Sequence, residues 1–148
     1  MLFRSMERFC TNFHRLPNSV KSRLTVENDD KATMYSVVDL YEGVYKVIGI
    51  PIVFDYHHHR FNTGGLTEED ALEVAISTWV DIVPVVHYSE SRNIEQEDPK
   101  IRPQAHSDYV YDYIDTYGNR VDIMVEAKAK ELAVLKYKEI HNDIRTNS

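Results

Sequence analysis

Four short apolar runs, separated by longer segments of mixed polarity, dominate the pattern of hydrophobic positions along the chain. The runs cover residues 24–26, 51–54, 82–86 and 121–125. Each run is short and rich in β-branched residues, which is typical of a buried strand. We therefore predict four strands that are buried on both faces.

The segments between the runs have the spacing of helices. Over residues 34–47 the apolar positions recur at steps of three and four, which indicates an amphipathic helix. Thr67 is followed by three acidic residues, and this order is typical of an N-cap and the first helical turn. Further helices are predicted over residues 6–23 with a break near Pro17, over 108–117 ending at Gly118, and over 128–140.

The alternation of strands and helices predicts the fold class. Buried strands that alternate with helices form a parallel sheet with helical crossovers, here in the order α-(βα)₄. The 148 residues suffice for one hydrophobic core, and no linker or low-complexity tract divides them. We therefore expect a single α/β domain over residues 1–148, with a long irregular loop over 89–107.

Side chains that bind metal ions follow every predicted strand. These residues are Glu27 after the first strand, Asp55 and His58 after the second, His87 after the third, His106 in the following loop, and Glu126 after the fourth. The carboxyl ends of parallel strands form one edge of the sheet, where ligands bind. Asp55 and His58 have the D-x-x-H spacing, which lets both reach one ion. The sequence therefore predicts a metal centre at this edge.

Each of these residues also has an ordinary explanation when it is taken alone. Glu27 could be a loop acid, the three consecutive histidines could form a solvated turn, and His87 could be a structural histidine. Together, carboxylates and imidazoles without a thiolate favour Mn²⁺, Zn²⁺ or Fe²⁺ over a closed structural zinc site. Three carboxylates and three imidazoles exceed the needs of one ion. Such clusters catalyse hydrolysis, often of phosphodiesters. Some barrel-shaped α/β enzymes use the same ligand types for sugar isomerisation.

Composition and charge narrow the class of protein further. The net charge is −7, yet residues 1–25 hold five basic side chains against Glu7 alone, so the rest of the chain is strongly acidic and a poor generic binder of nucleic acid. Cys10 is the single cysteine, which excludes a disulfide framework and a zinc site made of cysteines alone. No apolar stretch approaches the ~20 residues of a membrane span, and the N-terminus lacks the apolar core of a secretory signal. We therefore expect a cytoplasmic protein without a membrane partner.

Five segments carry a resemblance to a known family. They read LTVEND (residues 24–29), FDYHHH (54–59), HYS (87–89), HSDY (106–109) and DIMVEAKAK (122–130). In order and approximate spacing they resemble successive motifs of the UV damage endonucleases, and the resemblance covers nearly the whole chain. Looser similarity extends to the endonuclease IV-like apurinic nucleases and to xylose isomerase-like barrels.

The resemblance implies a fold and an activity. The fold is a (β/α)₈ TIM barrel, of which this chain would form the C-terminal half, strands five to eight. The activity is DNA repair: a hydrolase with two or three divalent ions, usually Mn²⁺ with Zn²⁺ or Mg²⁺ as alternatives, activates water and incises the backbone on the 5′ side of UV photoproducts.

The resemblance also assigns roles to individual residues. The implied metal ligands are Glu27, Asp55, His58, His87, His106 and Glu126. The implied catalytic residues are Glu27, Glu126 and Lys128, while Arg60, Arg102 and Lys130 are candidates for contact with DNA. One departure is Val85, which stands where the family has a lysine, so any role of that lysine is missing here.

The length of the chain leads to three hypotheses about its function. First, it is part of a UV damage endonuclease that acts on damaged double-stranded DNA and is incomplete alone, so that it needs a separate N-terminal half or self-association. Second, it is a sugar isomerase or epimerase of the xylose isomerase-like type. Third, it is a catalytically inactive remnant that binds metal or protein.

Overall fold

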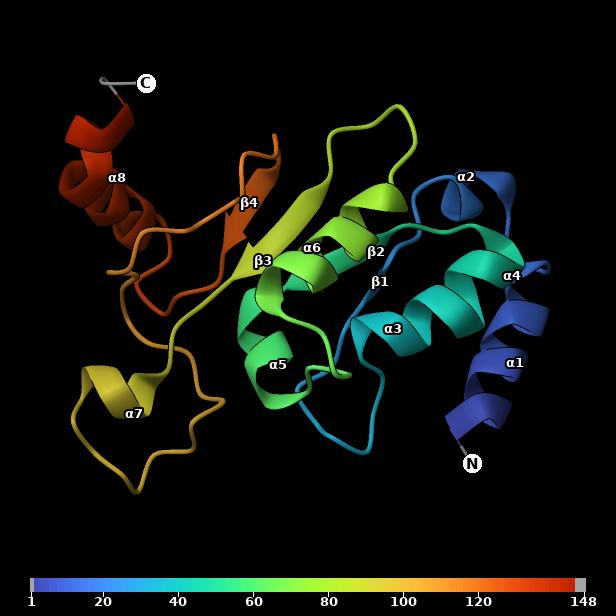
Figure 1. Cartoon of the computed structure of the whole chain (residues 1–148), viewed down its shortest axis with the longest axis horizontal. Helices are drawn as coiled ribbons and strands as arrows, with labels where there is room; N and C mark the ends of the chain where they lie inside the picture. The colour runs from blue at the N-terminus through green and yellow to red at the C-terminus, as the bar shows by residue number, and fades with distance from the viewer. Residues whose placement is uncertain (1, 146–148) are drawn as a thin grey trace.

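The structure, a computed structural model that describes residues 2–145, is built on four parallel strands in the order β1-β2-β3-β4 (Figure 1). The strands are β1 (Val26–Glu27), β2 (Ile52–Asp55), β3 (Val85–Tyr88) and β4 (Asp122–Val125). Each crossover adds the next strand on the same side. The sheet does not close on itself, so that β1 and β4 are its edges.

The register of the sheet aligns the carboxyl ends of its strands. Asp55 at the end of β2 pairs with His87 of β3, and Tyr88 at the end of β3 pairs with Val125 at the end of β4. Glu27 at the end of β1 pairs with Val53. Residues that follow the four strands are therefore brought to one edge, as the sequence predicts.

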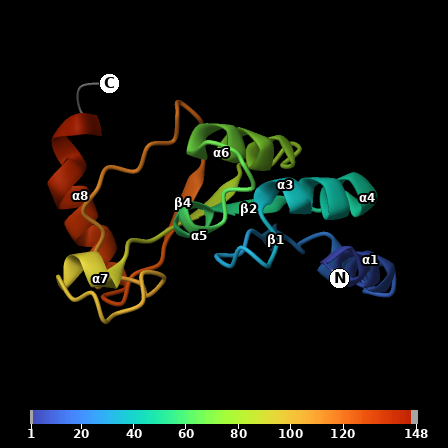
Figure 2. The same cartoon turned by 60° about the horizontal axis from the view of Figure 1, so that its bottom comes forward.

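The helices lie on the faces and at the two ends of the sheet. Figures 1 and 2 show α1 and α8 at opposite ends of the molecule, with α3 and α6 side by side over one face. In chain order they are α1 (Leu2–Phe13), α2 (Asn18–Lys21), α3 (Val37–Leu40), the π-helical turn η1 (Tyr41–Tyr45), α4 (Lys46–Ile48), α5 (Tyr56–Phe61), α6 (Glu68–Ser77), α7 (Arg92–Glu95) and α8 (Glu131–Arg145). In the described part of the chain, no helix combines the length and the apolar character that crossing a membrane requires.

Local signals set the ends of the principal helices. The Ser36 hydroxyl accepts the backbone N–H of Asp39, and the Asp39 carboxylate accepts the backbone N–H of Ser36, which is a capping box at the start of α3. Thr67 caps α6 through the N–H of Asp70, as the sequence predicts. Gly49, with a φ of +74°, ends α4 in the left-handed conformation that glycine adopts without strain.

The hydrophobic core lies between the sheet and the α3–α6 layer. All four residues of β2 are buried, which explains why this run lacks the alternation of a half-exposed strand. Phe54 and Ile52 are fully buried beside Leu72 of α6. At the far edge the pattern changes, since Met124 of β4 is 54% exposed.

The helix predicted over residues 108–117 is wrong, because distant side chains bond the backbone groups that a helix would need. The carboxylate of Glu90 accepts the N–H groups of Tyr111 and Asp112 at 2.8 Å each. The hydroxyl of Tyr137 in α8 accepts the N–H of Ile114 at 3.1 Å. The segment is therefore irregular, while the short helices α5 and α7 form where the sequence indicated a turn and a loop.

Three of the strands, β1, β3 and β4, are shorter than their apolar runs. Leu24 and Thr25 precede β1, which has two residues. Ile82 lies before the start of β3 and is 62% exposed. The apolar run therefore marks where each strand lies, while pairing with the neighbouring strand sets its length.

Candidate metal centre

The carboxyl edge of the sheet gathers carboxylates and imidazoles from all four strands. Glu27 ends β1, Asp55 ends β2, and His87 belongs to β3. Glu126 follows β4 directly, and its N–H donates to the Tyr88 carbonyl at 2.9 Å, which continues the ladder by one residue. His58 lies one helical turn after Asp55, in α5.

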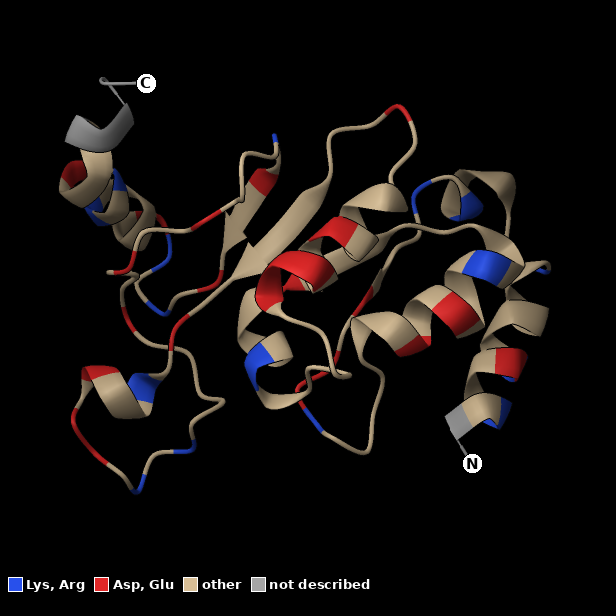
Figure 3. Ribbon diagram, viewed as in Figure 1, with Lys and Arg blue, Asp and Glu red and all other residues tan. Residues whose placement is uncertain are grey.

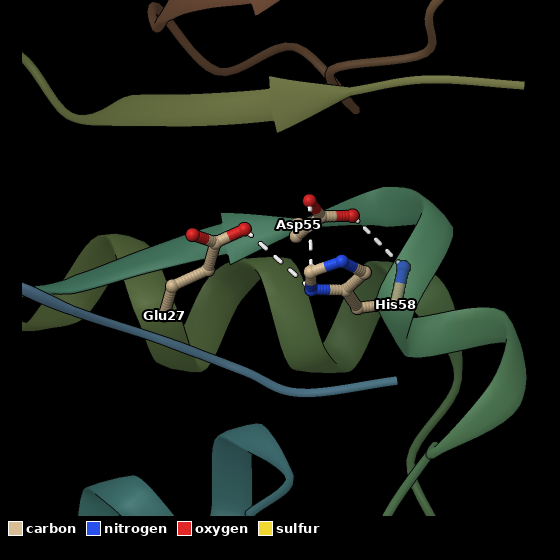
Figure 4. Close-up of side chains that lie close together, drawn as sticks. All are labelled: Glu27, Asp55 and His58. Carbon is tan, nitrogen blue, oxygen red and sulfur yellow. Dashed lines mark hydrogen bonds and ion pairs between the residues drawn. The ribbon is translucent and has the colours of Figure 1, made fainter. Parts of the chain in front are cut away.

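Two triads of possible ligands share one carboxylate. Ligand atoms of Glu27, Asp55 and His58 lie within 4.8 Å of one another, and so do those of Asp55, His87 and Glu126. Figure 4 shows the first triad, in which Nδ1 of His58 is 3.5 Å from Oε1 of Glu27 and 3.6 Å from Oδ2 of Asp55. A carboxylate that belongs to both triads suits two neighbouring ions.

The second triad is joined to the first through His87. Its Nδ1 atom is 3.2 Å from Oε1 of Glu27 and 3.4 Å from Oε1 of Glu126. One imidazole therefore spans the distance between the first and the fourth strand end. The four strand ends form one continuous cluster.

Asp55 has the environment expected of a buried metal ligand. Its side chain is fully buried, and Oδ1 accepts the N–H of His58 at 2.8 Å. Oδ2 has no hydrogen-bond partner among the described residues. Because a buried carboxylate oxygen without a partner is costly, the donor set fits a bound cation.

Asn28 positions two members of the first triad, Asp55 and His58, and sequence reasoning missed this role. Its side-chain amide accepts the N–H of Asp55 at 2.9 Å and donates to the Asp55 carbonyl at 3.0 Å. Its own carbonyl oxygen is 2.7 Å from Nδ1 of His58. Because a carbonyl can only accept, Nδ1 of His58 carries the proton in this arrangement. The signal in the sequence was a polar residue directly after a strand.

The protonation of the cluster reflects its crowding. Burial, followed by the neighbouring carboxyl group of Glu27, raises the pKa of Asp55 to about 7. Burial alone would raise the pKa of Glu27, but the hydrogen bond with His87 and the proximity of Asp55 bring it below its ordinary value. The hydrogen bond with Glu27 raises the pKa of His87. Without cations Asp55 therefore keeps its proton up to about neutral pH, and a metal ion would displace that proton.

His106 and Lys128 border a cleft beside the two triads. Nε2 of His106 is 3.9 Å from Oε2 of Glu126, which is farther than the 3.4 Å between Nδ1 of His87 and Oε1 of Glu126. A cleft of about 520 Å³ is lined by Gln104, Ala105, His106, Glu126, Ala127 and Lys128. Two of the predicted ligands and the predicted catalytic lysine therefore share one opening.

The three candidates for contact with DNA lie outside the lining of this cleft. Arg60 is exposed, and its guanidinium lies 5.7 Å from the centre of the Tyr88 ring. Arg102 is exposed in the loop before His106. Lys130 borders a separate groove between β4 and α8, which Val85 also lines.

Charge is distributed unevenly over the structure. Figure 3 shows basic residues around α1 and α2, and acidic residues on α3, α6 and the end of β1. The acids of the helices face solvent for the most part, as Glu69 and Asp70 do. The acids at the strand ends differ, because they lie together and are partly or fully buried.

Comparison with known proteins identifies the family. The family model described as UV-endonuclease UvdE matches residues 4–146. The chain belongs to the UvdE family of UV endonucleases. It is 35% identical over 144 residues to a UV DNA damage endonuclease of Bacillus cereus (strain Q1), covering 90% of this chain and 43% of the relative. It is 37% identical over 154 residues to that of Bacillus pumilus (strain SAFR-032), covering 97% of this chain and 45% of the relative.

A solved structure shows the same architecture. The crystal structure of SacUVDE matches with a TM-score of 0.77 at 32% identity, over 95% of this chain and 47% of that chain. The TIM-barrel-like α/β fold predicted from the sequence is thereby confirmed, with an open sheet of four parallel strands. The UvdE-family chain spans less than half the length of these relatives. The family named by these comparisons is one of UV endonucleases and not of the sugar isomerases that the ligand types also allowed.

Proposed function

We propose that this chain is part of a metal-dependent DNA repair endonuclease that incises the backbone on the 5′ side of UV photoproducts. The observation that carries the proposal is the pair of triads that share Asp55, whose buried Oδ2 atom has no hydrogen-bond partner among the described residues. The curated relatives are UV DNA damage endonucleases, which supports damaged double-stranded DNA as the substrate.

The proposed metal ligands are the six residues of the strand ends and the adjacent loop. They are Glu27, Asp55, His58, His87, His106 and Glu126. Carboxylate and imidazole donors suit Mn²⁺, with Zn²⁺ or Mg²⁺ as alternatives, and the two triads suit two or three ions. Bound ions would supply an activated water and neutralise charge that develops on the phosphate.

The protein contributes position and charge to the same reaction. Glu27 and Glu126 hold opposite sides of the cluster, through the imidazole of His87 between them. Lys128 borders the cleft with Glu126, where an ammonium group can contact a DNA phosphate. Arg60, Arg102 and Lys130 are proposed as more distant contacts with the DNA backbone, which would carry affinity but no sequence preference.

The free edges of the sheet support a partner for this half of the barrel. In the described part of the chain, β1 and β4 each pair with one neighbour, and Met124 of β4 is 54% exposed. Unpaired, partly apolar edges favour pairing with further strands. We propose that a separate N-terminal half or a second copy of this chain covers these edges, and that the chain alone has little activity.

Reconstitution tests the proposal directly. The chain is mixed with the part of the Bacillus pumilus relative that it does not match, and is incubated with UV-irradiated duplex DNA and Mn²⁺. The expected result is a nick on the 5′ side of the photoproduct in the mixture, and none without irradiation or with a chelator. A mixture that leaves DNA intact, while the two halves of the relative itself produce the nick, contradicts the proposal.

Calorimetry separates the nuclease from an inactive remnant. Titration with Mn²⁺ should show binding to the wild-type chain and weaker binding to Glu27→Gln. The matched control is Glu139→Gln, an exposed acid of α8, which should bind as the wild type does. If neither the wild type nor Glu27→Gln binds Mn²⁺, a remnant without a metal centre is the remaining interpretation.

A further inference from the structure

His57 is a buried histidine that lies between two proposed ligands in the sequence. It belongs to α5, is 1% exposed, and its Nε2 atom is 3.1 Å from the carbonyl oxygen of Gln104. Because a carbonyl only accepts hydrogen bonds, Nε2 of His57 is the donor. The side chain therefore ties the end of β2 to the loop that carries His106.

The ring of His57 also contacts the ring of His106. The two rings meet edge to face, with centroids 5.7 Å apart and an angle of 78° between their planes. On another side, the ring of His57 meets Phe61 in the same manner, at 5.1 Å and 87°. Phe61 thus supports His57 at the position from which it contacts His106.

Other contacts fix the backbone of the loop on both sides of His106. The N–H of Arg92 donates to the carbonyl of Ala105 at 2.8 Å, and the N–H of Ser107 donates to the carbonyl of Glu90 at 2.9 Å. His106 itself forms an antiparallel bridge with Ser91. These contacts hold the chain but leave the direction of the imidazole open.

Among the ring contacts of the described residues, the contact with His57 is the one that involves His106. The imidazole of His106 is one-third exposed, and its Nε2 lies 3.9 Å from Glu126. A partly exposed side chain without such a contact would populate several rotamers. The ring of His57 thus packs against His106 in the rotamer that places Nε2 beside Glu126.

We propose that His57 is a positioning residue that holds the loop of Gln104 and the imidazole of His106 in the geometry for binding a metal ion. This inference rests on the proposed metal centre. Removal of a residue that contacts a metal ligand and orients it typically weakens metal affinity by about 10- to 100-fold. His57 does so without being a ligand itself, and it couples the second and third strand ends.

Two variants and a matched control test the proposal. His57→Phe keeps an aromatic edge but loses the N–H, while His57→Asn is smaller, keeps an N–H and loses the ring. The control is His59→Phe, because His59 is another buried histidine of α5 and its ring packs on Phe54 at 5.4 Å. Each change is made in the wild-type chain and in a His106→Ala background.

The first measurement needs no metal. In the metal-free chain, NMR should show a nuclear Overhauser effect between the ring protons of His57 and His106, which His59→Phe retains. In His57→Asn, which loses the ring, the His106 side chain should show averaged rotamers while its backbone amide shift changes little. His57→Phe, which keeps an aromatic ring, should keep the His106 rotamer. Absence of the ring-to-ring contact in the wild type overturns the proposal, whether or not the chain binds metal.

The second measurement is the affinity for Mn²⁺. Both His57 variants should weaken Mn²⁺ binding by about 10- to 100-fold. The control His59→Phe should change the affinity by less than about threefold. In the His106→Ala background, the His57 changes should cause no further loss of affinity. Equal losses with and without His106 would show a general structural role and overturn the proposal. If no variant, wild type included, binds Mn²⁺, the metal centre fails, and the NMR result alone decides whether His57 positions His106.

Discussion

The side chain of Asn28 continues the pairing of β1 with β2 by exchanging two hydrogen bonds with the backbone of Asp55. The amide oxygen accepts the Asp55 N–H at 2.9 Å, and the amide nitrogen donates to the Asp55 carbonyl at 3.0 Å. Both groups are buried. A side chain thus replaces the third backbone pair of a two-residue strand and fixes the carboxylate that belongs to both triads.

Asn28→Ala should therefore destabilise the chain. The change leaves an N–H and a carbonyl of Asp55 buried without partners, which costs about 1–3 kcal/mol for each group. Urea unfolding followed by circular dichroism measures the loss. The control, Asn18→Ala in α2, alters an exposed asparagine and should change stability by less than about 0.5 kcal/mol. Equal stability of the two variants would show that water replaces the amide of Asn28.

The arrangement of the site follows from a rule of topology that the sequence already satisfies. Glu27, Asp55, His87 and Glu126 each stand at the end of an apolar run, and parallel strands bring such ends to one edge. Their convergence could therefore be predicted without coordinates. The distances that divide them into two triads depend on register and side-chain rotamers, which the sequence pattern does not encode.

The residues that sequence reasoning missed act across long separations in the chain. Glu90 bonds the backbone at Tyr111 and Asp112, and this contact removes a helix that the local pattern favours. His57 was grouped with its neighbours as a turn, yet α5 forms because Asp55 caps it through the N–H of His58. Local propensity describes a segment alone, so partners from distant segments remain invisible to it.

The stability of the metal-free chain should decrease as the pH rises. The folded-state pKa of Asp55 is raised to about 7 by burial and by Glu27, well above the ~3.9 of an unfolded carboxyl group. The folded chain therefore binds this proton more tightly, and the stabilisation is complete below about pH 4 and is lost as the pH rises through about 7. The raised pKa values of His58 and His87 act in the same direction.

Urea unfolding with a chelator at pH 5 and pH 8 checks this dependence. The wild type should lose on the order of 2 kcal/mol between the two pH values, and Asp55→Asn should lose less. Asp112→Asn, which alters an exposed acid, should lose as much stability between pH 5 and pH 8 as the wild type does. A stability of the metal-free wild type that rises between pH 5 and pH 8 would contradict the protonated state of Asp55.

Glu90 should govern the order of the irregular segment around Tyr111 and Asp112. Its carboxylate accepts the N–H groups of Tyr111 and Asp112, so Glu90→Ala leaves both without their acceptor. Hydrogen exchange at these two amides should become at least about tenfold faster, because their exchange then requires no opening of that bond. Glu7→Ala, at an exposed position of α1, should leave both rates unchanged. Unchanged exchange in Glu90→Ala would mean that other contacts order the segment.

Glu126 should contribute to metal binding through its charge, because it borders His87 at 3.4 Å and His106 at 3.9 Å. Glu126→Gln keeps the shape of the side chain but removes the negative charge that binds a hard cation. Saturating Mn²⁺ should therefore raise the melting temperature of this variant by less than that of the wild type. Asp55→Asn removes the carboxylate of both triads and should abolish that rise. The comparison with Glu139→Gln excludes a general effect of net charge. If Glu126→Gln and Glu139→Gln respond to Mn²⁺ equally, Glu126 is not a ligand, and the triad of Glu27, Asp55 and His58 binds the metal alone.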